Sequence, residues 1–85
     1  MVINLEESAA YYNDLGLKVF SDGNPIYAAS LLKKSYLTSS NEQGILVNLG
    51  LSLMQQGLDE AAERCYNIAL NSEDLKTARA ANKNL

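Results

Sequence analysis

The sequence predicts an all-α protein of about five helices, each antiparallel to the next along the chain. Three observations support this fold class. Apolar residues recur at helical spacing, the second half of the chain aligns onto the first, and short glycine-containing turns separate the periodic segments. No segment carries the alternating pattern of a strand. Because the turns are short, each helix is expected to pack beside the next one.

The first two helices are expected at residues 7–21 and 25–38. On the first, a face with the spacing i, i+3, i+4, i+7 consists of Tyr12, Leu15, Gly16 and Val19. On the second, the core face consists of Ala28, Leu31, Leu32, Ser35 and Tyr36. In the turn between them, Gly23 suits the left-handed position that ends a helix, Asn24 suits an N-cap, and Pro25 suits the first helical turn.

Three further helices are expected at residues 42–56, 59–70 and 73–85. The core face of the third consists of Leu46, Leu49, Gly50 and Leu53. That of the fourth consists of Ala62, Cys65, Tyr66, Ala69 and Leu70. Gly57 lies in the turn between these two helices, and Ser72 suits the N-cap of the fifth.

The two halves of the chain come into register when Leu15 is placed on Leu49. Identical residues then also coincide at Gly16 and Gly50, Leu17 and Leu51, Gly23 and Gly57, and Ala28 and Ala62. We therefore expect one domain over residues 1–85, with repeats at about 9–42 and 43–76 and a partial repeat or capping helix at about 73–85. The small residues at positions 16, 28, 50 and 62 would let two helix backbones approach closely.

This pattern resembles the tetratricopeptide repeat, a helix–turn–helix unit of about 34 residues. The first repeat matches the family motif with Tyr12, Leu15, Gly16, Val19, Ala28, Leu32 and Ser35. The second repeat matches it with Leu46, Leu49, Gly50, Leu53, Ala62, Tyr66 and Ala69. The resemblance implies stacked hairpins in a short right-handed solenoid. It also implies a concave face, lined by the first helix of each repeat, that holds a peptide or a partner's helix.

Composition narrows the range of functions. The chain has 7 basic and 10 acidic residues and a net charge of −3, so it lacks the basic excess that attracts nucleic acids and anionic membranes. Histidine, the commonest general base and metal ligand, is absent. The single cysteine, Cys65, lies on an apolar helical face and favours a reducing interior such as the cytoplasm. We expect no enzyme activity, no cofactor, no metal and no membrane insertion.

A second helical stripe lies beside the core face and is the candidate partner-binding surface. It comprises Asn13, Leu17, Phe20, Val47, Asn48, Leu51, Met54 and Gln55. Packing within one hairpin covers one side of a helix, so this second apolar side needs a neighbour. Either a partner segment fills an open groove there, or the chain's own Val2, Ile3 and Leu5 cover the stripe. Lys33 and Lys34 are expected to be solvated on a helix exterior.

Three functional interpretations follow from these features. The first is a non-enzymatic module that binds a partner peptide or helix in a partly apolar concave groove. The second is a structural module that forms homo-oligomers, including helix-swapped ones, since about three repeats are usually needed for stability and this chain has two and a part. The third is the regulatory repeat region of a longer protein.

Overall fold

The computed structural model describes residues 4–39, 44–71 and 81–83, without the side chains of residues 5 and 6. It contains α1 (Leu5–Ser21), α2 (Pro25–Thr38), α3 (Gly44–Gln55) and α4 (Asp59–Leu70). Residues 81–83 form a further helical turn, and no strand occurs among the described residues. The expected all-α fold is confirmed. None of the described helices is long and apolar enough to cross a membrane.

The helix boundaries follow the capping residues. The bounds of α2 and α4 are those expected from the sequence. α1 begins before the expected residue 7, because Asn4 Oδ1 accepts a hydrogen bond of 3.1 Å from the Glu7 backbone N–H and so caps the helix. The expected start of the third helix at residue 42 and most of the expected fifth helix lie outside the described residues.

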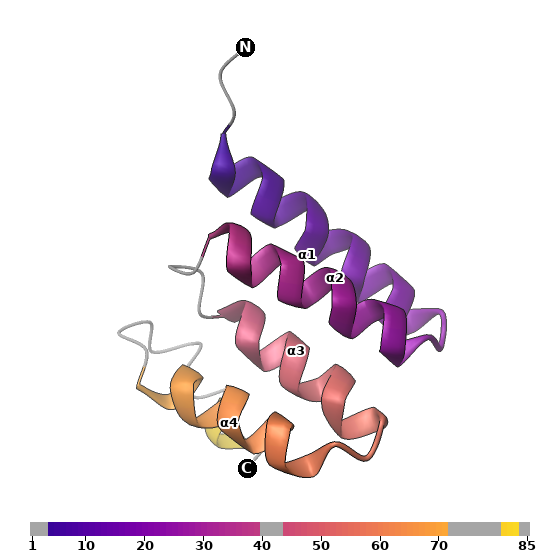
Figure 1. The fold of residues 1–85 in the computed structure, drawn as a ribbon, viewed down its shortest axis with the longest axis vertical. Helices are drawn as coiled ribbons and strands as arrows, with labels where there is room; N and C mark the ends of the chain where they lie inside the picture. The colour runs from indigo at the N-terminus through magenta and orange to yellow at the C-terminus, as the bar shows by residue number, and fades with distance from the viewer. Residues whose placement is uncertain (1–3, 40–43, 72–80, 84–85) are drawn as a thin grey trace.

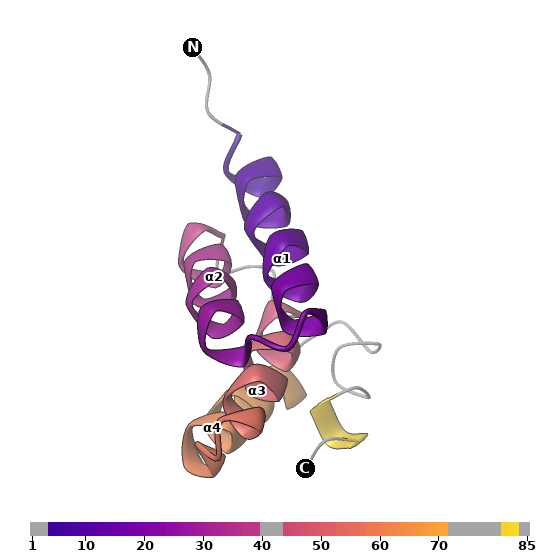
Figure 2. The same cartoon turned by 90° about the vertical axis from the view of Figure 1, so that its right-hand side faces the viewer.

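The four helices form two layers. Consecutive helices pack on one another, and α1 also touches α3. Figure 1 shows their directions alternating down the molecule from the indigo α1 to the orange α4. Figure 2 shows α1 and α2 side by side in the upper half, with α3 partly in front of α4 below them. α1 and α3, which are in contact, form one layer, and α2 and α4 form the other.

The two hairpin turns have the same geometry. Gly23 and Gly57 have φ values of +88° and +79°, in the left-handed region that glycine adopts without strain. In the first turn the N–H of Gly23 donates to Phe20 and that of Asn24 to Val19. The second turn repeats both backbone bonds at the equivalent positions of the second hairpin. This pair of bonds is a Schellman motif, which satisfies the last carbonyl groups of α1 and α3.

The start of the second helix differs between the hairpins. Asn24 Oδ1 accepts a hydrogen bond of 3.2 Å from the Tyr27 backbone N–H and caps α2. The equivalent residue before α4 is Leu58, which makes no side-chain cap. Asp59 and Glu60 lie in the first turn of α4, where the helix dipole favours negative charge.

The core lies between the two layers. Its cluster of buried residues comprises Ala29, Leu32, Ile45, Leu46, Val47, Leu49, Ala62, Cys65, Tyr66, Ala69 and Ala81. The expected core residues Ala28 and Gly50 are also buried, whereas Tyr12, Leu15, Val19 and Leu53 are half-buried. Ala81 belongs to the expected fifth helix, and its full burial places residue 81 against this core. The burial of Cys65 agrees with its expected place on an apolar face.

The two packing glycines make room for side chains of the following helix. A Cβ atom on Gly16 would lie 2.8 Å from Leu32 Cγ, and one on Gly50 would lie 2.5 Å from Tyr66 Cε1. The sequence predicts this close approach at Ala28 and Ala62. In the structure the Ala28 carbonyl oxygen lies 3.4 Å from the Cβ position of Gly16, and the larger residue four positions later fills the rest of the space in both hairpins. The glycines thus admit bulky side chains between the helices.

Candidate functional site

The predicted partner-binding residues lie on α1 and α3, which form one layer of the molecule. We call the surface that they form the α1–α3 face. Two of its residues meet across the hairpins, because Asn48 Nδ2 donates a hydrogen bond of 3.1 Å to Asn13 Oδ1. The two amides are part-buried, so this bond ties α1 to α3. The structure therefore brings together residues that are 35 positions apart in the sequence.

Exposure differs along the α1–α3 face. Leu17 is 37% exposed and Met54 is 38% exposed. Leu51 and Phe20 are half-buried, and Gln55 is exposed. Val47 differs from the expectation, because it is buried within the core cluster and offers no surface to a partner. Helical spacing places Val47 on the stripe, but the packing of the whole domain buries it.

A shallow hollow lies at the turn end of the α1–α3 face. Its lining includes Phe20, Gly23, Pro25 and Gln55, and its volume is about 410 Å³. Beside it, Gln56 Nε2 donates hydrogen bonds of 3.2 Å to the carbonyls of Pro25 and Ser52. The hydrogen bond to Pro25 links the start of α2 to the turn after α3 and so ties the two hairpins together at this end.

A second surface, which the sequence analysis missed, lies on the opposite layer. We call it the α2–α4 groove; its volume is about 520 Å³. Its floor comes from α3 and its walls from α2 and α4. The lining residues are Ala29, Ser30, Lys33, Tyr36, Leu37, Leu46, Leu49, Leu53, Ala61, Arg64, Cys65 and Ile68. Leu37 is 71% exposed and Ile68 is 45% exposed. Both are large apolar residues outside the core face of their helix, and in the sequence they were the signal that could have indicated this groove.

The charged residues that line the α2–α4 groove, within the described part of the chain, are Lys33 and Arg64. Lys34 points elsewhere, because its Nζ lies 4.5 Å from the centre of the Tyr12 ring. Adjacent residues of a helix lie on different faces. Both lysines are exposed, as expected, but Lys34 lies over the Tyr12 ring of α1 whereas Lys33 lines the groove.

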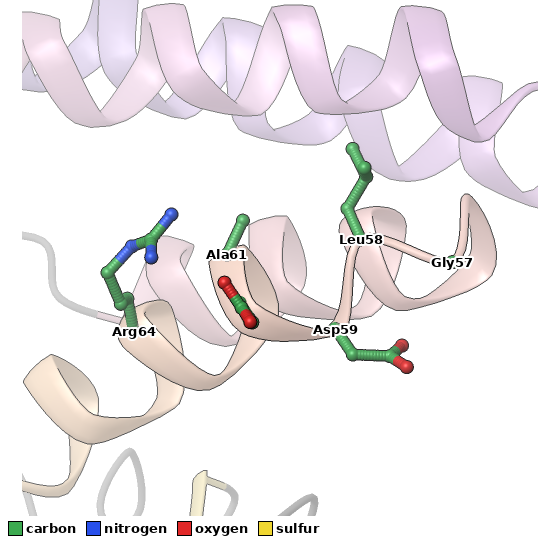
Figure 3. Close-up of a pocket in the computed structure, with 6 residues that line it drawn as sticks. Gly57, Leu58, Asp59, Ala61 and Arg64 are labelled. Carbon is green, nitrogen blue, oxygen red and sulfur yellow. The ribbon is translucent and has the colours of Figure 1, made fainter.

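The groove adjoins a second hollow at the start of α4. That hollow has a volume of about 550 Å³ and shares Ala61 and Arg64 with the groove. Figure 3 shows Leu58, Ala61 and Arg64 projecting from the same side of the helix, while Asp59 points away from them. The lining of this hollow also includes Asp59 and Glu60, so the apolar surface of the groove gives way to acidic residues toward the turn.

Two titratable groups are buried in the core. Burial raises the pKa of the Cys65 thiol, and the Arg64 guanidinium opposes this shift. Burial also raises the pKa of the Tyr66 hydroxyl, and Cys65 adds to the increase. Both groups are therefore neutral near pH 7, and Cys65 behaves as a small core residue. Among the described residues, no three Cys, Asp or Glu side chains gather as metal ligands would.

Comparison of the chain with known protein families, curated proteins and solved structures found no match. The function must therefore be inferred from the residues and surfaces of this chain.

Proposed function

We propose that this chain is a non-enzymatic, tetratricopeptide-like interaction module that binds a partner peptide or helix on the α1–α3 face. The observation that carries the proposal is the exposure of Leu17 and Met54 after both hairpins have packed. Exposed apolar side chains on two packed helices can take the apolar face of an incoming segment. Met54 suits such a surface, because its flexible thioether adapts to different partners.

The internal repetition supports the tetratricopeptide-like assignment. The backbone bonds of the Gly23 turn recur at the Gly57 turn, and the contact of Gly16 with Leu32 recurs between Gly50 and Tyr66. In both cases contacts of the folded chain are repeated, and not only residue types of the sequence. The resemblance then implies that the first helices of the repeats, α1 and α3, present the binding face.

The polar residues of the α1–α3 face can orient a bound partner segment. The Asn13–Asn48 hydrogen bond fixes the spacing of the two helices, and the remaining amide atoms can bind a partner's backbone. The hollow beside Phe20 and Gln55 can take one side chain of the partner. A buried free thiol at Cys65 agrees with the proposal that the module works in a reducing compartment such as the cytoplasm.

The test uses peptides selected from a displayed library against the whole chain. Each selected peptide is titrated by fluorescence anisotropy against wild type, Leu17→Glu and the matched control Ile26→Glu, which changes an exposed residue on α2. We expect Leu17→Glu to weaken binding at least about tenfold, roughly 1.4 kcal/mol, with unchanged helicity by circular dichroism. The control should bind as wild type does. Equal binding by all three proteins would contradict the proposal.

Self-assembly through the same face is the second candidate function, and the exposure of Leu17 and Met54 favours it too. Light scattering across a concentration series separates the two. A mass of 9.3 kDa at all concentrations supports a free binding face. A dimer that Leu17→Glu dissociates shows that a second copy occupies the face.

A further inference from the structure

We propose that the α2–α4 groove is a second interaction surface, which binds an acidic, amphipathic segment of a partner protein. It lies on the layer opposite the α1–α3 face, so it is independent of the function proposed above.

The apolar part of the groove is suited to large apolar side chains. Leu46, Leu49 and Leu53 of α3 form its floor. The rims carry Leu37 and Ile68, which stay largely exposed although they are large aliphatic residues. Its volume of about 520 Å³ is within the range of about 300–1,000 Å³ that is usual for built binding sites. A helix that presents apolar residues at i, i+3 or i+4, and i+7 could fill such a groove.

The charge of the groove specifies the chemistry of the occupant. Lys33 stands on the α2 wall and Arg64 on the α4 wall. Neither forms an ion pair with another described residue. The described lining of the groove itself contains no acidic residue, whereas Asp59 and Glu60 line the adjoining hollow. Acidic residues that flank the apolar side chains of the partner would meet a positive charge on each wall.

The same charges argue against a symmetric pair of copies in this groove. A twofold interface brings the same surface of each copy together. Lys33 and Arg64 of one copy would then face Lys33 and Arg64 of the other, with no described acidic residue in the lining to separate them. Juxtaposed like charges at an interface are costly. An acidic partner segment removes this cost, and we therefore assign the groove to one.

The test compares two designed helical peptides that share the same leucines at i, i+3 and i+7. One carries glutamates beside the leucines, and the other carries lysines. Their binding to the whole chain is measured by fluorescence anisotropy at low and high salt. We expect the acidic peptide to bind at least about tenfold more tightly at low salt, and the difference to shrink as salt screens the charges. Equal affinities, or no binding of either peptide, would overturn the proposal.

Substitutions in the chain identify the surface to which the peptides bind. The double variant Lys33→Glu, Arg64→Glu should reverse the preference between the peptides, whereas Lys18→Glu, a single charge reversal on α1, should leave it unchanged. Ile68→Asp should weaken both peptides, and circular dichroism checks that it remains folded. Leu17→Glu, which tests the α1–α3 face, should not affect either peptide. Binding that Leu17→Glu abolishes, or a dimer that Ile68→Asp dissociates, would refute the assignment of the groove.

Discussion

Replacement of Gly50 by alanine tests whether the glycines of α1 and α3 serve packing. In an exposed helix interior this change gains up to about 1 kcal/mol of helix propensity. Here the new Cβ would lie 2.5 Å from Tyr66 Cε1 and 2.8 Å from Cζ. These separations are about 1 Å short of the optimal carbon–carbon contact of roughly 3.5–4.0 Å. Tyr66 is fully buried, so its ring has no free space to enter.

The gain in helix propensity and the cost of overpacking together give a net loss of stability. Overpacking of a filled core costs about 1–3 kcal/mol, which exceeds the gain in propensity. We expect Gly50→Ala to lower the free energy of unfolding by about 1 kcal/mol and the melting temperature by about 4–8 °C. Gly16→Ala should cost less, because the nearest Leu32 atom lies at 2.8 Å and not at 2.5 Å. Thermal and urea unfolding, followed by far-ultraviolet circular dichroism, measure both effects.

The same substitution in a Tyr66→Leu protein tests whether the tyrosine ring causes the loss of stability. Tyr66→Leu removes Cε1 and Cζ, the two atoms nearest the new Cβ, and copies the natural pair of Gly16 and Leu32. In that background the cost of Gly50→Ala should fall to about that of Gly16→Ala. If Gly50→Ala raises the melting temperature, or costs the same with leucine as with tyrosine at position 66, then close packing is not the reason for the glycine.

Three further predictions concern buried and capping groups. Ser35 and Ser52 are both fully buried, but the Ser35 hydroxyl donates to a backbone carbonyl whereas that of Ser52 has no hydrogen-bond partner among the described residues. Urea titration should therefore show a loss of about 1 kcal/mol for Ser35→Ala and no loss for Ser52→Ala. Asn24→Ala should cost about 1 kcal/mol and Leu58→Asn should gain part of that amount, both read from thermal melts. The raised pKa of Cys65 favours the folded state below its ordinary value of 9.0, so stability should fall as pH rises above that value. In Cys65→Ala the urea midpoint should fall less between pH 7 and pH 10.

The helices were predictable because local chemistry determines them. The glycine turns and Asn24 appear in the sequence as recognisable signals, and the structure shows each in the expected role. The early start of α1 was also encoded, since Asn4 caps it, but the sequence analysis did not use that signal. The use of Gly50 could not be predicted in full, because periodicity does not show which residue of the next helix fills the space.

The surfaces were harder to predict than the helices. Spacing placed Val47 and Leu51 on one stripe, but only the packed structure shows that Val47 is buried. The α2–α4 groove combines residues from three helices, and no single helical stripe contains it. Lys33 and Lys34 look alike in sequence, yet their different directions give them different surroundings.

The make-up of the core has a consequence for local opening. The main cluster of buried residues draws on α2, α3, α4 and Ala81, and none of its members comes from α1. α1 packs closely on α2, but among its described side chains the fully buried one, Ala9, is small and lies outside this cluster. Segments that bury few large apolar side chains open at lower free energy than the rest of a domain, and their amide hydrogens exchange sooner. We expect the amides of α1 to exchange before those of α3.

Opening of α1 would also break the Asn13–Asn48 hydrogen bond and carry Leu17 away from α3. A partner on the α1–α3 face can then bind only while α1 is closed, so part of its binding energy is spent on holding this helix in place. Slower amide exchange in α1 would thus report binding, even before the partner's contacts are known.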